Sequence, residues 1–326
     1  MTKRLASTVV LLGIVFSGLP CRAQEPVKLR ASVVAKTFGF APLWVASKRG
    51  FFNQQNLDVE ILLIRGSDVS TQALAGGSLQ ISGASSDAPI AAIERGLDMV
   101  IIGGIINGLS QSIMAGKNYK TYEDLRGATL GANSLTAGTA FAFRRVLKAK
   151  GLEYPRDYNL INVGGTPQAL AALASGQIAA APLSLPVNFV AEEQGFNTIG
   201  RFIDVIPHYQ LSVYSVMRPW AEKNRSVVVR FMKSIALACR WIYGNKEATA
   251  ELLAKEMGLK RDYARKGWDF YTEKGLWNPR GDVTLEGLGI VAQIYAEQNQ
   301  LKSPPNVAKF VDQSYLRTAL KELGGG

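Results

Sequence analysis

The sequence predicts a two-lobed α/β protein with mainly parallel sheets and a helical C-terminal part. Strand-like and helix-like segments alternate from residue 27 to residue 201, which is typical of βαβ units. The chain also repeats itself faintly at an offset of 99, as in the similar stretches 74–79 and 173–178. From residue 220 onward the pattern is mostly helical. We therefore expect two similar lobes whose equivalent loops face each other across a cleft.

The first repeat has strand-like segments and helices with recognisable ends. Pro42 suits the first turn of a helix, and Gly50 and Gly96 suit positions just after helices. We expect strands at 27–34, 57–64, 79–82 and 99–102, and helices at 43–49, 69–75 and 88–95.

The second repeat follows the same order, and the rest of the chain completes the first lobe. We expect strands at 128–132, 159–163 and 178–181, a returning strand at 209–217, and helices at 140–150, 168–174, 225–243, 246–257, 261–270 and 285–297, with one more helix that ends near Gly195. The predicted first lobe comprises residues 24–105 and 207–326, and the second comprises residues 106–206. The chain would cross between them near 103–108 and 204–209, as two hinge segments.

Residues 1–23 have the pattern of a secretory signal peptide. Lys3 and Arg4 precede an apolar run at 5–19, and the segment ends in a small-x-small cleavage site at Ala23. Cleavage after Ala23 would release the mature chain into the periplasm. Two alternatives stay open: an uncleaved anchor, for which the apolar run is short, and lipid attachment at Cys21, whose preceding residues do not match the usual lipoprotein pattern.

The composition argues against several classes of protein. After cleavage only Cys239 would remain, in an apolar stretch, so we expect a buried thiol and no internal disulfide. Loss of three basic residues with the signal lowers the formal net charge from +11 to +8. The basic residues are scattered and match no nucleic-acid-binding motif, so we expect no nucleic acid as partner.

The sequence gives little support to an enzyme. His208 is the single histidine, and no ligand-spaced cysteine, histidine or glutamate lies near it, so neither a zinc site nor a Ser-His-Asp triad is expected. The G-x-x-x-x-G-K-[ST] and G-x-S-x-G motifs are absent. We predict no catalytic residue, no metal and no cofactor.

The candidate ligand-binding residues lie in the loops between strands and helices. Ligands of open α/β sheets bind beyond the carboxyl ends of the strands, and helix N-termini suit anionic groups. Any of the Ser, Thr and Asp residues in these loops also suits a simple helix cap. The candidates are Thr37, Phe38, Gly39, Phe40, Ser67, Asp68, Ser85, Ser86 and Asp87 in the first lobe, and Ser134, Thr136, Gly138, Thr166 and Ser184 in the second.

The charges of these loops point in two directions. Lys36 and Arg65 would suit an anion, although Arg65 also suits a solvent-facing position at a strand end. Asp68 and Asp87 would suit an amine or a heterocyclic N–H, and Phe38 and Phe40 an apolar or aromatic part of a ligand. The sequence leaves both an anion and a zwitterion open.

Several stretches resemble the periplasmic solute-binding proteins of ABC importers, in the branch for nitrate, sulfonates, taurine and thiamine-precursor pyrimidines. They are 41–46, 50–52, 72–77, 124–127 and 174–178. The resemblance implies a type II periplasmic binding protein fold with two crossovers. It also implies a monomer that captures a small anionic or zwitterionic solute and delivers it to an ABC permease with its ATPase.

The resemblance also implies two alternatives. One is a binder of a thiamine-precursor pyrimidine or another aromatic heterocycle. The other is a pyrimidine-synthase-like enzyme of the same fold, a class that uses iron and consumes its own active-site histidine. The export signal and the position of His208, far along the sequence from the predicted cleft loops, disfavour the enzyme.

Overall fold

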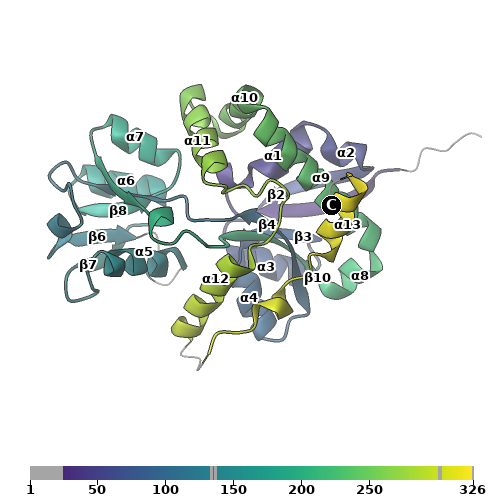
Figure 1. Ribbon diagram of the computed structural model, residues 1–326, viewed down its shortest axis with the longest axis horizontal. Coiled ribbons are helices and arrows are strands. Elements are labelled where there is room, and N and C mark those ends of the chain that lie inside the picture. The colour runs from purple at the N-terminus through teal and green to yellow at the C-terminus, as the bar shows by residue number, and fades with distance from the viewer. Residues whose placement is uncertain (1–24, 133–134, 136–137, 300–302, 325–326) are drawn as a thin grey trace, which may run out of the picture.

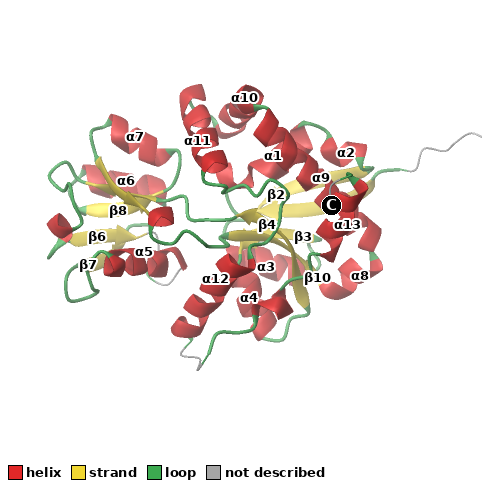
Figure 2. Cartoon of the chain, in the orientation of Figure 1, coloured by secondary structure: helices red, strands yellow, loops and turns green. Residues whose placement is uncertain are grey.

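The computed structural model describes residues 25–132, 135, 138–299 and 303–324. Two five-stranded sheets lie side by side, each with helices on both faces (Figure 1). We call the part of the chain around the first sheet the first lobe and the part around the other sheet the second lobe. Figure 2 shows the two groups of strands between their helical layers. This arrangement confirms the predicted two-lobed α/β fold class.

The two sheets have equivalent strand orders. The first sheet has the order β2-β1-β3-β10-β4, and the second has the order β7-β6-β8-β5-β9. In the first lobe the strands are β1 (Val27–Val33), β2 (Leu57–Leu63), β3 (Ile81–Ser85), β4 (Met99–Ile106) and β10 (Ser212–Met217). In the second lobe they are β5 (Ser112–Ala115), β6 (Thr129–Ala132), β7 (Asn159–Asn162), β8 (Ala180–Leu183) and β9 (Asn197–Arg201).

The sequence repeat corresponds to a structural repeat. Helix α3 (Ser67–Ala75) in the first lobe and helix α6 (Thr166–Ala174) in the second begin and end 99 positions apart. Strands β3 and β8, which follow them, also begin 99 positions apart. The faint identities therefore mark equivalent elements.

The helices divide between the lobes in the same way. The first lobe contains α1 (Ala41–Lys48), α2 (Phe51–Gln54), α3 and α4 (Asp87–Glu94), and the second contains α5 (Gly138–Ala149), α6 and α7 (Val187–Glu193). The C-terminal helices pack on the first lobe (Figure 1) and are α8 (Arg218–Lys223), α9 (Arg225–Gly244), α10 (Lys246–Met257), α11 (Arg261–Glu273), α12 (Leu285–Gln298) and α13 (Ser314–Glu322). None of the helices in the described ranges is both long enough and apolar enough to span a membrane.

Both sheets are mixed, where the sequence pattern predicted mainly parallel ones. Strands β1, β2 and β3 are parallel to one another, whereas β10 is antiparallel to β3 and β4. In the second lobe β5 is antiparallel to β8 and β9. Both antiparallel strands directly follow a crossing from the other lobe. They therefore enter their sheet at the edge where its parallel strands end, and run in the opposite direction.

The chain crosses between the lobes after β4 and again after β9. Gly103 and Gly104 lie within β4, so the first crossing begins after Ile106, later than the glycines suggested. The second crossing includes a short 3₁₀ turn, Phe202–Asp204, and continues to β10.

The apolar core of the second lobe continues into the first. One cluster of buried side chains includes Phe143 and Leu130 of the second lobe together with Ile101 and Leu288 of the first. A larger cluster fills the first lobe between its sheet and α9, where Cys239 is buried, as its apolar surroundings predicted. The lobes are therefore in contact as well as linked by the two crossings.

Candidate functional site

The two lobes approach each other where α4 and α5 begin. A Cβ atom added to Gly138, the first residue of α5, would lie 3.2 Å from the Tyr209 hydroxyl and 3.7 Å from the Oδ2 atom of Asp87. Asp87 begins α4 in the first lobe, and Tyr209 lies in the second crossing. These three residues thus bring both lobes and a crossing to one point, which we call the inter-lobe junction. Two of them, Asp87 and Gly138, were predicted from the sequence.

Asp87 is a half-buried carboxylate with a second carboxylate nearby. Burial raises its pKa above the ordinary value for aspartate, and the negative charge of Asp68 raises it further. The backbone N–H groups of Asp87 and Ala88 act in the opposite direction without cancelling the rise. Asp68 is exposed in the first turn of α3. Two acidic side chains therefore stand at this edge of the first lobe.

Tyr209 was missing from the predicted site. Only 3% of its surface is exposed, and its hydroxyl has no hydrogen-bond partner among the described residues. Burial and the charge of Asp87 both raise its pKa, so it stays a neutral phenol at physiological pH. The sequence pattern placed it at the start of a returning strand, and only its position in a crossing could have indicated a role at the junction.

The predicted serines of the first lobe hold the loops together. The backbone N–H of Ser85 donates to Ser67 Oγ at 3.1 Å, which joins the end of β3 to the start of α3. Ser86 is buried, and its Oγ donates to the carbonyl oxygen of Gln210 at 2.5 Å. The side chain of Ser86 makes no capping hydrogen bond to α4, contrary to the expected helix cap. Its hydrogen bond instead fixes α4 against the second crossing, next to Tyr209.

The segment from Thr37 to Phe40 packs mainly inward. The rings of Phe38 and Phe40 are 0% and 2% exposed, and Phe38 stacks on Tyr271 with ring centroids 6.0 Å apart. A Cβ atom on Gly39 would lie 2.0 Å from Ile106 Cδ1, so any larger residue here would force the Ile106 side chain to move. The expectation that the two rings cover a ligand is therefore corrected: they belong to the core, and Thr37 is the half-buried side chain of the group.

Neither cationic candidate forms an ion pair with Asp87 among the described residues. Lys36 Nζ donates to the carbonyl oxygen of Glu256 at 3.1 Å and lies 5.5 Å from the centre of the Trp44 ring. It is therefore directed toward α10 within the first lobe. Arg65 is exposed and has no ion-pair partner in the described part of the chain, which fits a strand-end residue facing solvent.

The second lobe contributes small polar groups to its strand ends. Thr166 begins α6, and Ser184 lies between β8 and α7, where its carbonyl oxygen accepts a hydrogen bond from the N–H of Val187 at 3.0 Å. Both residues are half-buried. Ser134 and Thr136, also predicted for this lobe, lie outside the described residues.

A second set of contacts joins the lobes at α7 and α11, and we call it the α7–α11 latch. Glu193 of the second lobe accepts hydrogen bonds from the Tyr263 hydroxyl at 2.5 Å and from Lys260 Nζ at 3.3 Å, both in the first lobe. The rings of Phe189 and Tyr263 lie 6.0 Å apart. These hydrogen bonds lower the pKa of Glu193, so the latch stays charged at neutral pH.

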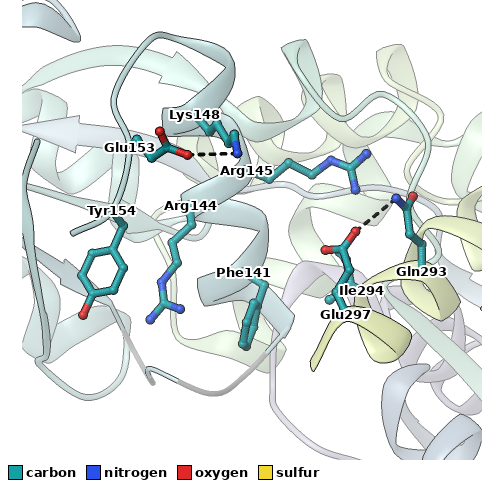
Figure 3. Close-up of a pocket in the computed structure, with 9 residues that line it drawn as sticks. All are labelled: Phe141, Arg144, Arg145, Lys148, Glu153, Tyr154, Gln293, Ile294 and Glu297. Atoms are coloured by element: carbon teal, nitrogen blue, oxygen red, sulfur yellow. Dashed lines mark hydrogen bonds and ion pairs between the residues drawn. The ribbon is translucent and has the colours of Figure 1, made fainter. Parts of the chain in front are cut away.

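A groove of about 540 Å³ lies between α5 and α12 (Figure 3). Lys148 pairs with Glu153 at 3.0 Å across one side of it, and Gln293 donates to Glu297 at 3.1 Å on the other. The guanidinium of Arg144 lies 4.6 Å from the centre of the Tyr154 ring. Four of its polar side chains thus pair with one another, whereas Nε of Arg144 is buried without a partner among the described residues, so the groove is a second ligand-site candidate after the junction.

The described residues offer no metal centre. They contain no group of three or more His, Cys, Asp or Glu side chains that could hold an ion. His208 is exposed, with Nδ1 3.5 Å from a carboxylate oxygen of Glu286.

Known proteins share both sequence and fold with this chain. A protein family described as NMT1/THI5 like matches residues 37–249, more than half of the chain. A Brucella abortus (strain 2308) protein provisionally named a binding protein is 23% identical over 305 residues, which are 91% of this chain and 94% of that protein.

Solved structures with this fold include both binding proteins and an enzyme. The periplasmic aliphatic sulphonate-binding protein SsuA from Escherichia coli matches with a TM-score of 0.72 and 19% identity, over 90% of this chain and 100% of that chain. The periplasmic nitrate-binding protein NrtA from Synechocystis PCC 6803 matches with a TM-score of 0.69 and 17% identity, over 92% of this chain and 89% of that chain. The desulfurization enzyme DszB matches with a TM-score of 0.69 and 15% identity, over 91% of this chain and 99% of that chain. At these identities the likeness establishes the fold alone.

Proposed function

Since this chain belongs to the NMT1/THI5-like family, we propose that it is an exported solute-binding protein that captures a small polar solute between its lobes and delivers it to an ABC importer. The observation that carries the proposal is the inter-lobe junction, where Asp87 of one lobe, Gly138 of the other and Tyr209 of a crossing meet. A solute held there would touch both lobes. Only such differential contact can shift a protein from an open to a closed arrangement.

The predicted location and partners follow from this role. Residues 1–23 read as an export signal, and SsuA and NrtA are periplasmic, so we place the protein in the periplasm. Its partners would be a membrane permease and the ATPase of that permease. We expect it to act as a monomer, because a two-lobed binding protein encloses its solute within one chain.

We also propose that the chain binds without catalysis, although DszB shares the fold. Cys239, the cysteine among the described residues, is buried in α9, and burial raises its pKa to about 12, so it stays a thiol at neutral pH. His208 is exposed and pairs with Glu286. Neither residue is placed to act as a nucleophile or base at the junction.

A thermal-shift screen of the purified protein tests the binding function. The compounds would be sulfonates, nitrate, amino-sulfonates, pyrimidines and aliphatic amines. A ligand that binds the native state at about 100 times its Kd stabilises it by about 2.7 kcal/mol, which raises the Tm by several degrees. Absence of any shift across the panel would contradict the proposed function. Turnover of a hit compound would contradict the non-catalytic part of the proposal.

A further inference from the structure

We propose that the solute carries a cationic nitrogen with at least one N–H group, which Asp87 and Tyr209 bind together at the inter-lobe junction. The inference rests on the proposed function and narrows the class of its solute. The sequence left anionic and zwitterionic solutes open. The junction favours a zwitterion or a cation over a simple anion such as nitrate or an alkanesulfonate.

The first argument is the sign of the charge around the junction. Asp87 lies within it, and Asp68 is close enough to raise the pKa of Asp87 by its charge. Of the two cations in these loops, Lys36 is engaged by Glu256 in its own lobe, and Arg65 is exposed and is not among the charges that shift the pKa of Asp87. An anion placed against Asp87 would meet like charge in a partly desolvated site, where such repulsion is costly.

The second argument is the hydroxyl of Tyr209. Buried polar groups nearly always have a hydrogen-bond partner. Tyr209 as a whole is 3% exposed, and no hydrogen bond joins its hydroxyl to another described residue, although this oxygen is not itself among the fully enclosed polar atoms. A phenol both donates and accepts hydrogen bonds. Its oxygen and Oδ2 of Asp87 lie 3.2 and 3.7 Å from the position that a Cβ atom on Gly138 would take, so both oxygens face the same side of this glycine. A solute with N–H groups on that side could donate to both oxygens.

Because Gly138 has no side chain, it does not cover these two oxygens. Its Cβ position would lie 3.2 Å from the Tyr209 hydroxyl, closer than a carbon normally approaches, so a side chain would occupy the space in front of both oxygens. The glycine also begins α5, so the second lobe comes close to Asp87 at this position. The same position therefore gives the second lobe a contact with a bound solute.

A simple helix-cap role does not account for Asp87. A carboxylate that only caps a helix is stabilised in its charged form by the N–H groups and the helix dipole, so its pKa falls. Here burial and Asp68 outweigh the two backbone N–H groups, and the pKa of Asp87 rises. The protein thus balances the negative charge of this half-buried carboxylate only in part, and a cationic ligand would stabilise it.

The test sorts small probes by charge on the wild-type protein and three variants. The probes are agmatine and putrescine as cations, taurine as a zwitterion, and ethanesulfonate and nitrate as anions. Glycine betaine serves as a zwitterion whose cationic group has no N–H. The variants are Asp87→Asn, Tyr209→Phe and, as a matched control, Asp58→Asn, an exposed aspartate at the opposite end of β2. Titration calorimetry follows any probe that raises the Tm.

We expect an N–H cation or taurine to bind, and glycine betaine, ethanesulfonate and nitrate to bind at least tenfold more weakly. A charge-assisted hydrogen bond contributes about 1.5–3 kcal/mol, so Asp87→Asn should weaken binding about tenfold to a hundredfold, and Tyr209→Phe less. Asp58→Asn should bind as the wild type does. Circular dichroism would verify that each variant is folded.

Two results would overturn the inference, and they are distinguishable. Binding of ethanesulfonate or nitrate with affinity unchanged or improved in Asp87→Asn would refute the cationic solute while leaving the proposed function intact. Absence of any thermal shift here and in the wider screen would refute the proposed function, and this inference with it.

Discussion

The two lobes have the same architecture but different chemistry at equivalent positions. An offset of 99 relates α3 to α6 and β3 to β8, and it pairs Gly39 of the first lobe with Gly138 of the second. The same offset pairs Asp68 with Pro167 and Asp87 with Pro186. Asp68 and Asp87 thus both correspond to prolines, which carry no charge and donate no N–H bond.

The difference separates the scaffold from its specificity. The repeat supplies two sheets whose strand ends and helix starts meet at the inter-lobe junction, and this part of the design is shared. The first lobe then contributes the carboxylates, whereas the second contributes close approach through Gly138 and small polar groups at Thr166 and Ser184. Substitutions in the first lobe should therefore affect binding through charge, and substitutions at Gly138 in the second lobe through steric fit.

Filling the glycine of the second lobe should have the largest effect. In Gly138→Leu the new side chain would meet the Tyr209 hydroxyl and Asp87, so the lobes could not close on a solute. We expect binding to weaken more than about a hundredfold by calorimetry, because overpacking alone costs about 1–3 kcal/mol and the solute contacts are lost as well. Gly244→Leu is the control, since Gly244 is exposed and has nothing within 4 Å of its Cβ position. Equal losses in both variants would argue against the junction.

The charge of the first lobe should make binding depend on pH. Burial and the charge of Asp68 raise the pKa of Asp87 above the ordinary value for aspartate, so this carboxylate becomes protonated at a higher pH than an exposed aspartate. As the pH falls through that pKa, affinity for an amine should drop by up to about tenfold per pH unit, while Tyr209 stays neutral throughout. Titration of the wild type and Asp87→Asn at several pH values measures the effect. If the affinity of Asp87→Asn depended on pH as steeply as that of the wild type, another titrating group would be responsible for the pH dependence.

The α7–α11 latch offers a smaller test of how the lobes stay together. Glu193→Gln would weaken the bonds from Tyr263 and Lys260, which link the lobes independently of any solute. Because the charged groups of Glu193 and Lys260 are both exposed, we expect affinity to fall only about two- to fivefold. The solute preference should not change, because the latch does not touch the junction carboxylates. Glu251→Gln, on the exposed face of α10, serves as the control, and a change in solute preference would contradict this division of roles.

The smallest effect should be on the stability of the solute-free protein. A carboxyl whose pKa is raised on folding stabilises the folded state below its ordinary pKa, and this contribution is lost as the pH rises through the raised value. At neutral pH the charged, half-buried form of Asp87 destabilises the folded state, and Asp87→Asn removes this charge. The Tm of the variant without solute should therefore be at least that of the wild type, and up to one or two degrees higher, on the order of 0.5 kcal/mol. A clear fall in the Tm would show that Asp87 is chiefly a structural cap.

The sequence allowed much of the fold to be predicted but only part of the site. Apolar periodicity and helix-end residues located α10 at its observed bounds, and the repeat located α3 and α6 to within two residues. Strand direction was harder, because alternation of apolar residues does not reveal that β5 and β10 enter their sheets after a crossing. These strands became antiparallel through chain topology.

The site residues show the same limit. Asp87 and Gly138 could be proposed because strand ends and helix starts leave a signature in the sequence. The rings of Phe38 and Phe40 face the core because a short 3₁₀ turn orients them inward, and loop composition does not specify this. Tyr209 reaches the junction only through the contact between the lobes, which no local pattern records.

A crystal structure of the protein with a bound amine tests the central claim most directly. The account predicts the charged nitrogen of the solute within about 3.2 Å of the Asp87 carboxylate, with the Tyr209 hydroxyl as a second partner and the second lobe in contact beside Gly138. A solute in the α5–α12 groove of Figure 3, or one that touches a single lobe, would contradict it.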